Sequence, residues 1–348
     1  MVGITPSRSQ PYDIRLAVMG DLSVLAPRVL CLGEALVDRL GPLGGDPSTA
    51  LAADCDDRLG GAPANVACAL ARLGTPVGLI GRLGEDAIGA AFRDLFRQRD
   101  VAVQALQSDA SHPSRVVLVR RHANGERVFQ GFAGDQDLGF ADQMLDRGEL
   151  QQMWPGLIEQ ARWLLVGTIP LATRASADSL HWVLAQAKAA DLALALDVNW
   201  RPTFWDLEAD PAEGPTADAL AAIKPVLEQA SLLKLAREEA LWFFGSDDPA
   251  VIAAALPQQP DVVVTDGANP IRWWIAHEAG SMAVFQPSQV IDTTGAGDAF
   301  TAGLLHCWDR PVNVRLRFAS ACGALVCGGA GAIDPQPREQ DVLAFLNQ

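Results

Sequence analysis

The stretch DTTGAGDAF, residues 292–300, places two glycines and an alanine between two aspartates, at the start of the apolar run AFTAGLLHCW. Small residues at a helix N-terminus leave the backbone N–H groups unobstructed, and the helix dipole favours negative charge there. The stretch is therefore either a plain turn capped by Asp298 or an anion site. In the second interpretation, Asp298 accepts the proton of a hydroxyl group that attacks a bound phosphate. The pattern then predicts a phosphoryl-transfer site.

Strand-like and helix-like segments alternate along the chain on the N-terminal side of this stretch. The apolar run that ends at Gly33 is typical of a buried strand, and a glycine-led helix follows at 60–74. Alternating strands and helices of this length predict an α/β fold with a largely parallel sheet covered on both faces. The further expected strands are 77–84, 163–171, 192–200, 231–236 and 261–267, and the further expected helices are 87–100, 176–191, 219–230 and 237–245.

Two segments interrupt the alternation, at about 36–59 and 112–136. The second contains Asn124–Gly125 between two extended runs, which is a strong hairpin signal. We expect both segments to form a small antiparallel sheet, here called the lid. The sequence contains no interior linker, so residues 28–348 are predicted to form one domain after a loose N-terminal extension at 1–27.

The composition favours small-molecule chemistry. The 348-residue chain is 49% hydrophobic and has a formal net charge of −15, with lysine only at positions 188, 224 and 234. Nucleic acids and anionic membranes require clustered basic residues, so neither is expected as a partner. The sequence contains no apolar run long enough to cross a bilayer and no secretory signal, which predicts a soluble protein.

The six cysteines are scattered, and most of them lie in apolar runs. None forms a CxxC pair, which predicts free, mostly buried thiols and a reducing cytoplasm. The five histidines share no ligand spacing, and none is assigned to a metal. The cysteines are Cys31, Cys55, Cys68, Cys307, Cys322 and Cys327.

Two motifs together carry a family resemblance. The chain has neither GxxxxGK[ST] nor GxGxxG after its first strand, which excludes the common nucleotide motifs. DTTGAGDAF together with GGAPANVA, residues 60–67, instead resembles the two signatures of the ribokinase-like, or PfkB, sugar kinases. The resemblance extends from about Arg28 to the C-terminus, and GEALVD, DVNWRP and the GER hairpin tip are most similar to fructokinases. It implies a three-layer α/β/α fold with a β lid, and transfer of the γ-phosphate of ATP to a sugar hydroxyl.

The resemblance assigns the catalytic centre to the opening stretch. Asp298 matches the general base of the family. The backbone amides of Gly295, Ala296 and Gly297 match its anion hole. A base and an anion hole in one turn stabilise the same transition state.

The resemblance also implies sugar-binding residues. Asp38, Gly61 and Asn65 match family positions, where a carboxylate and an amide orient hydroxyl groups and a glycine permits close approach. Asp38 could instead be a surface carboxylate, and Asn65 a helix cap. Arg201 follows a predicted strand at the edge where open α/β sheets bind ligands, so it either contacts substrate or forms a structural ion pair.

The nucleotide side is implied by the family's VTxGxxG turn and a late helix. Pro270 replaces the second glycine of the turn, and the loop is still expected to form. The residues assigned to ATP binding are Lys234, Thr265, Gly267, Ser320 and Gly331.

Metal ions are implied as well. Glu239 matches the glutamate that organises Mg²⁺ through water, with Glu238 as the adjacent alternative, but Ala236 replaces an expected asparagine three positions earlier. Solvated carboxylates on a helix face are the alternative. Backbone carbonyls of Asp292 and Thr294, with others from 328–331, resemble a monovalent-cation site, and potassium dependence is a hypothesis.

The acceptor is expected to be D-fructose, phosphorylated at its primary hydroxyl to fructose 6-phosphate. Ribose, a nucleoside or 2-keto-3-deoxygluconate remain alternatives, and an acid sugar would require a cation such as Arg115, Arg120 or Arg127. The substitutions Ala236 and Pro270 also leave open a regulatory protein that binds sugar or nucleotide without turnover. An exposed lid sheet could pair with a second copy, so a homodimer is left open.

Overall fold

The computed structural model describes residues 26–122, 127–134 and 139–348. Most of the expected N-terminal extension, residues 1–25, lies outside the described residues. The predicted Asn124–Gly125 turn lies outside them as well.

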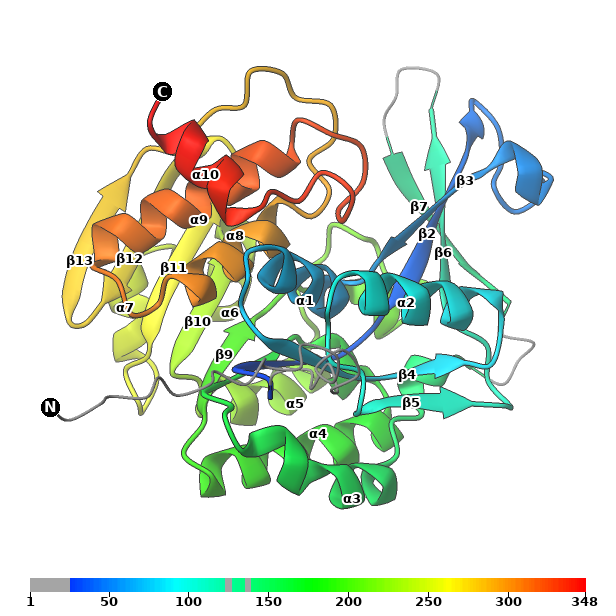
Figure 1. Ribbon diagram of the computed structural model, residues 1–348, viewed down its shortest axis with the longest axis horizontal. Helices are drawn as coiled ribbons and strands as arrows, with labels where there is room; N and C mark the ends of the chain where they lie inside the picture. Colours follow the sequence, from blue (N-terminus) through cyan, green and yellow to red (C-terminus); the bar gives the residue numbers. More distant parts are fainter. Residues whose placement is uncertain (1–25, 123–126, 135–138) are drawn as a thin grey trace, which may run out of the picture.

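A large, mostly parallel sheet forms the centre of the domain (Figure 1). The strands from β5 to β11 pair in parallel, and β12 and β13 add an antiparallel hairpin at one edge. This hairpin was not anticipated from the sequence. In sheet order the described strands are β13 (Glu278–Met282), β12 (Asn269–Ile275), β11 (Asp261–Asp266), β10 (Leu232–Ala236), β9 (Ala193–Asp197), β8 (Trp163–Val166), β1 (Val29–Leu32), β4 (Val77–Gly84) and β5 (Leu106–Asp109).

Helices cover both faces of the sheet because its strands are apolar on both sides. In β1, Val29 and Cys31 pack into one core, whereas Leu30 and Leu32 pack into the other. The predicted three-layer α/β/α architecture is therefore confirmed. On the first face lie α1 (Ala62–Arg72), α2 (Ala87–Gln98), α8 (Ala296–His306), α9 (Val312–Val326) and α10 (Glu339–Leu346); on the second lie α3 (Arg147–Ile158), α4 (Arg174–Ala189), α5 (Ala217–Leu227), α6 (Arg237–Phe244) and α7 (Pro249–Ala254).

A second, four-stranded sheet projects from the main domain and is the predicted lid (Figure 1). Its order is β3 (Asp56–Gly60), β2 (Leu36–Leu43), β6 (Val116–Arg121) and β7 (Arg127–Ala133). The pairs β2–β3 and β6–β7 are antiparallel, as expected. The middle pair, β2 and β6, is parallel, which the sequence pattern did not show.

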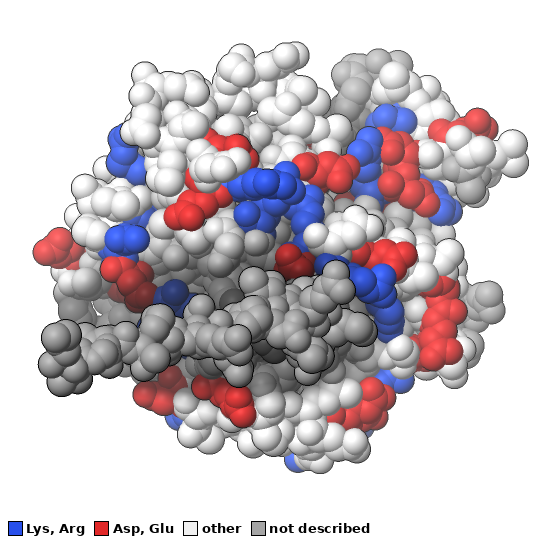
Figure 2. Space-filling model, viewed as in Figure 1, with Lys and Arg blue, Asp and Glu red and all other residues white. Residues whose placement is uncertain are grey.

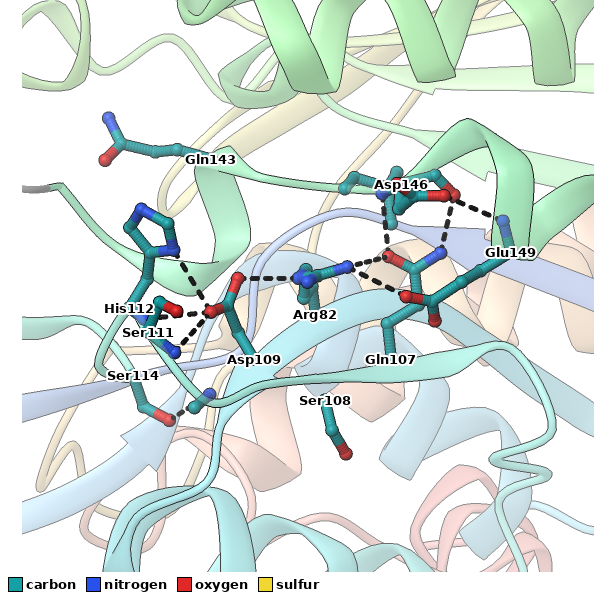
Figure 3. A network of polar contacts seen from close by, with 12 residues as sticks. Arg82, Gln107, Ser108, Asp109, Ser111, His112, Ser114, Gln143, Asp146 and Glu149 are labelled. Atoms are coloured by element: carbon teal, nitrogen blue, oxygen red, sulfur yellow. Dashed lines mark hydrogen bonds and ion pairs between the residues drawn. The ribbon is translucent and has the colours of Figure 1, made fainter.

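A polar network fixes the segment that leads from β5 into the lid (Figure 3). Arg82 on β4 donates to Asp109 Oδ2 at 2.8 Å and to Glu149 Oε1 at 3.2 Å. The other oxygen of Asp109 accepts from the backbone N–H of His112 at 2.9 Å. Ser114 Oγ accepts from the backbone N–H of the last residue of β4 at 3.0 Å. The segment that connects β5 to the lid is therefore fixed to the main sheet by hydrogen bonds.

Arg115, directly before β6, joins the lid to the main domain. Its side chain is buried and donates to both oxygens of Asp142, from Nε at 2.9 Å and from Nη2 at 3.1 Å. The guanidinium lies 4.4–4.8 Å from the ring centres of Phe132, Phe140 and Phe204. The side chain of Arg115 thus attaches the lid to the main domain.

Arg115→Leu is expected to lower the free energy of unfolding by about 3–5 kcal/mol, because the charge of Asp142 stays buried without its partner. Denaturant unfolding measures this loss. Arg174→Leu, which removes an exposed pair with Asp178, is the control and should change stability by less than about 1 kcal/mol. A similar small effect for Arg115→Leu would contradict the assigned role.

On the face shown in Figure 2, acidic side chains lie between the basic ones. Among the described residues, no helix is long and apolar enough to span a membrane. All six cysteines are unpaired, and four of them are buried, which agrees with the expected free thiols.

Candidate active site

The loop before α8 depends on glycine. Gly295, the N-cap, has φ of 78°, and a Cβ at this position would lie 2.5 Å from the Cβ of Ala332. The backbone N–H of Ala296 donates to the carbonyl of Thr293 at 3.2 Å, whereas none of the described residues accepts from that of Gly297. The helix therefore presents an open N–H group at the positive end of its dipole.

Asp298 lies in the first turn of the same helix. Asn65 Nδ2 on α1 donates to its Oδ2 at 2.8 Å, across 233 residues of sequence. Burial raises the pKa of Asp298 to about 6 and the charge of Asp197 adds to this shift, while Asn65, Lys234 and Arg201 oppose it. The carboxylate is therefore mainly ionised at neutral pH, with a pKa close to the working range of a general base.

A buried cation lies beside the anion loop. Lys234 Nζ on β10 donates to Asp197 Oδ1 at 3.0 Å, and the other oxygen of Asp197 accepts from Thr301 Oγ1 on α8 at 3.0 Å. A Cβ on Gly297 would lie 3.2 Å from this Nζ. Burial alone would lower the pKa of Lys234, but the neighbouring carboxylates outweigh it and raise the pKa above its ordinary value. A permanent positive charge thus borders Gly297.

Two cavities meet at this loop. The larger, of about 580 Å³, is lined by several carboxylates, and the smaller, of about 310 Å³, is mostly apolar. Thr265, Thr293 and Gly297 line both cavities, whereas Asp298 lines only the larger one and Ala296 only the smaller one. Molecules in the two cavities would therefore meet at Gly297, beside Asp298.

The residues predicted to bind sugar all line the larger cavity: Asp38, Gly61, Asn65 and Arg201. Gly61 has φ of 97°, and a Cβ there would lie 2.6 Å from the backbone oxygen of Glu34, so glycine is required. Asn65 lies within α1 and is not a cap, since Gly61 is the N-cap. Its Oδ1 is buried and has no hydrogen-bond partner among the described residues. Arg201 is exposed and donates to the carbonyl of the preceding residue at 2.8 Å, and it forms no ion pair with any residue that the structure describes.

The residues predicted to bind ATP are placed in two groups. Thr265, Gly267 and Ser320 line the smaller cavity, and Ser320 Oγ accepts from the backbone N–H of Phe285 at 3.0 Å. Gly331 and Lys234 are not among the residues that line this cavity. Lys234 lines the larger one instead, where it borders the shared loop. The turn between β11 and β12 forms despite Pro270, as expected.

Glu239 fits a role in ordering water better than direct metal ligation. Its Oε1 accepts from the backbone N–H of Trp200 and its Oε2 from that of Ala236, each at 2.7 Å. Burial raises the pKa of Glu239, which lines the larger cavity, whereas Glu238 is exposed. Among the described residues, no group of three or more His, Cys, Asp or Glu side chains could hold a metal ion. This donor set suits an ion held mainly by phosphates and water.

The segments predicted to hold a monovalent cation do come together. Asp292 Oδ1 accepts from the backbone N–H of Thr294 at 3.0 Å, and its Oδ2 accepts from that of Gly331 at 2.9 Å. The loop before α8 is thus attached to the loop after α9. The two loops whose backbone carbonyls form the predicted site therefore lie next to each other.

Sequence reasoning gave no role to two buried acids of this region. Asp197 holds Lys234 and lies at the end of β9, within DVNWRP. Glu34 lines the larger cavity and lies just after β1, within GEALVD. Both motifs had been noted for their resemblance. An acidic residue at the carboxyl end of a buried strand was the signal that could have identified them.

Comparison with known proteins shows the family to which the chain belongs. Residues 26–339 match the pfkB family of carbohydrate kinases. The chain is 33% identical over 336 residues to the fructokinase of Klebsiella pneumoniae, covering 92% of this chain and 99% of that protein. It therefore belongs to the pfkB carbohydrate kinase family, which confirms the resemblance.

Solved structures agree with this membership. The fructokinase of Xylella fastidiosa with bound ATP is 27% identical, with a TM-score of 0.75, and the match covers 92% of this chain and 98% of that one. A double mutant of the Vibrio cholerae fructokinase, with fructose, ADP and potassium ion bound, is 27% identical with a TM-score of 0.73, covering 92% and 98%. The ribokinase-like fold is thereby confirmed.

Proposed function

We propose that this chain is an ATP-dependent fructokinase that converts D-fructose to fructose 6-phosphate. The observation that carries the proposal is the meeting of two cavities at Gly297, with Asp298 in the cavity that also holds Asp38 and Asn65. The family membership supports sugar phosphorylation, and the names of the relatives support fructose.

In the proposed reaction, the sugar lies in the larger cavity and ATP in the smaller one. The primary hydroxyl oxygen attacks the γ-phosphorus in line, Asp298 accepts its proton, and the bond from phosphorus to the bridging oxygen of ADP breaks. The N–H groups at the start of α8, with the ammonium of Lys234 close by, stabilise the negative charge on the transferring group. The position of Lys234 beside Gly297 supports this assignment.

Metal ions complete the proposed chemistry. Mg²⁺, bound to the phosphates of ATP and to water ordered by Glu239, would neutralise phosphate charge. A potassium ion on the carbonyls of Asp292, Thr294 and the 328–331 loop would shape the anion loop. The lid would close over the sugar and exclude water, which prevents hydrolysis of ATP.

The charges in the larger cavity favour a neutral acceptor over an acid sugar. Asp38 and Asp298 both line it, and a sugar carboxylate would be repelled by ionised aspartates there. Arg115, a candidate partner for such a carboxylate, is already paired with Asp142. Arg120 lies 3.4 Å from Asp46 in the lid. The side chain of the third candidate, Arg127, lies outside the described residues.

An acceptor panel tests the proposal. ADP formation is measured with Mg²⁺–ATP and D-fructose, D-ribose, adenosine or 2-keto-3-deoxygluconate, with and without K⁺. We expect D-fructose to give the highest kcat/KM, with phosphate on its primary hydroxyl and a higher rate in K⁺. Preference for another acceptor would overturn the assignment to fructose, and binding of sugar and ATP without turnover would indicate a regulatory protein.

We also propose the bounds of the domain, its cellular compartment and a possible dimer interface. The kinase domain is taken to be residues 28–348, with the lid formed by about 36–59 and 112–136, and the cytoplasm is the proposed compartment. β3 and β7 are the outer strands of the lid sheet, so pairing with a second copy would use one of these edges. Sedimentation of the purified chain would test for the homodimer.

A further inference from the structure

Glu34 is a buried acid whose place in the acceptor site has no assigned purpose. It lies two residues after the end of β1, is only 3% exposed, and lines the larger cavity together with Asp38 and Asn65. Burial of a carboxyl group is costly unless the group is neutral or well paired. Contacts within the protein must therefore show how the carboxyl group of Glu34 is stabilised away from water.

The backbone holds Glu34 firmly against the start of α1. Its Oε1 accepts from the backbone N–H of Ala62 at 3.1 Å. The chain is packed so closely here that a Cβ on Gly61 would lie 2.6 Å from the Glu34 carbonyl, and a Cβ on Gly33 would lie 2.5 Å from Pro63. The hydrogen bond to Ala62 and this close packing consequently restrict Glu34 to one position beside the cavity that it lines. Apart from Ala62 and the backbone N–H of Glu34 itself, no described residue is seen to donate a hydrogen bond to this carboxyl group.

The surroundings keep this carboxyl group uncharged. Burial raises the pKa of Glu34 to about 8, and the charges of Asp142 and Asp298 add to the shift. The backbone N–H groups of Glu34 itself and of Ala62 oppose it without cancelling it. Arg115, which lines a small pocket together with Glu34, is engaged with Asp142. At neutral pH, Glu34 is therefore a carboxylic acid with an O–H group to donate.

We propose that Glu34 is an acceptor-binding residue that donates a hydrogen bond from its protonated carboxyl group to an oxygen of the sugar. This inference rests on the proposed function, because it assumes that the larger cavity binds the acceptor. It assigns opposite tasks to two acids: Asp38 accepts hydrogen bonds from sugar hydroxyls, while Glu34 donates one. A neutral polyhydroxylated sugar, whose oxygens both donate and accept, satisfies both.

The proposal predicts how acceptor affinity changes with pH. Because the donating form is lost as pH rises through the pKa of Glu34, the KM for D-fructose should increase above a pH of about 8, while the KM for ATP stays constant. Glu34→Gln keeps an acceptor for Ala62 and a permanent N–H donor. Its KM for D-fructose should stay near the neutral wild-type value at every pH. Glu34→Ala should raise this KM about tenfold at neutral pH, as expected for one lost hydrogen bond.

The experiment compares both KM values of the wild type, Glu34→Gln, Glu34→Ala and the control Glu149→Gln between about pH 6 and 9.5. The control, which alters a carboxylate of the network in Figure 3, should retain the wild-type profile. An alkaline rise that persists unchanged in Glu34→Gln would overturn the proposal, even if Glu34→Ala fails to fold. Absence of turnover by the wild type with every sugar would instead overturn the proposed function.

Discussion

Asp298→Asn is expected to lower kcat by about 10²- to 10⁴-fold, the usual contribution of a positioned general base. The amide keeps the size of the side chain but cannot take the proton of the attacking hydroxyl. Asp298 does not line the smaller cavity, so the affinity for ATP should stay near the wild-type value. Steady-state kinetics and nucleotide-binding calorimetry measure the two quantities.

The pH profile adds a second readout for the same residue. Since burial raises the pKa of Asp298 to about 6, the base is protonated and inactive below this value, and wild-type kcat should rise as pH increases through it. Asp298→Asn should lose this step. Asp218→Asn is the matched control, because Asp218 is an exposed aspartate in the first turn of α5. A variant of Asp298 that keeps more than a few per cent of activity would rule out its role as base.

Gly297→Val should be comparably damaging, with a loss in kcat of at least about 10²-fold, typical of a disrupted anion hole. A Cβ at this position already lies 3.2 Å from Lys234 Nζ, and the two methyl groups of valine would extend into the junction of the two cavities. The side chain would occupy the space that the transferring phosphoryl group needs. In contrast to Asp298→Asn, this variant should also bind ATP more weakly.

Gly156→Val provides the control for this substitution. Gly156 lies in α3, and a Cβ there meets no atom within 4 Å. This variant should keep wild-type kinetics and wild-type stability, because valine is at least as favourable as glycine in a helix. Unchanged catalysis in Gly297→Val, with a folded protein, would contradict the anion-hole assignment.

Much of the fold could be predicted because its signals are local. Apolar runs of strand length alternate with helical segments, and this order is sufficient to indicate a parallel sheet covered by helices. The lid segments were recognised by their break in the alternation. The parallel pairing of β2 with β6 and the added hairpin β12–β13 were not predicted, because strand neighbours distant in sequence are selected by packing of the whole sheet.

In the candidate site, too, local features could be predicted from the sequence, whereas contacts between distant segments could not. The sequence alone determined the loop before α8, since a positive φ at Gly295 and an open N–H at Gly297 are requirements of a few adjacent residues. Only the tertiary structure decided which charges surround Asp298. Asn65 contacts it across 233 residues, and Lys234 is paired with Asp197 beneath the same helix.

The roles of Arg115 and Glu34 depend on their burial in the fold. The sequence offered Arg115 as a ligand for an acid sugar and gave Glu34 no role, whereas the fold encloses the arginine between three aromatic rings and places the glutamate on the cavity wall. The protonation and partners of a side chain depend on solvent exclusion and on charges brought near by distant segments. A linear sequence specifies the groups, but their electrostatic surroundings exist only in the assembled fold.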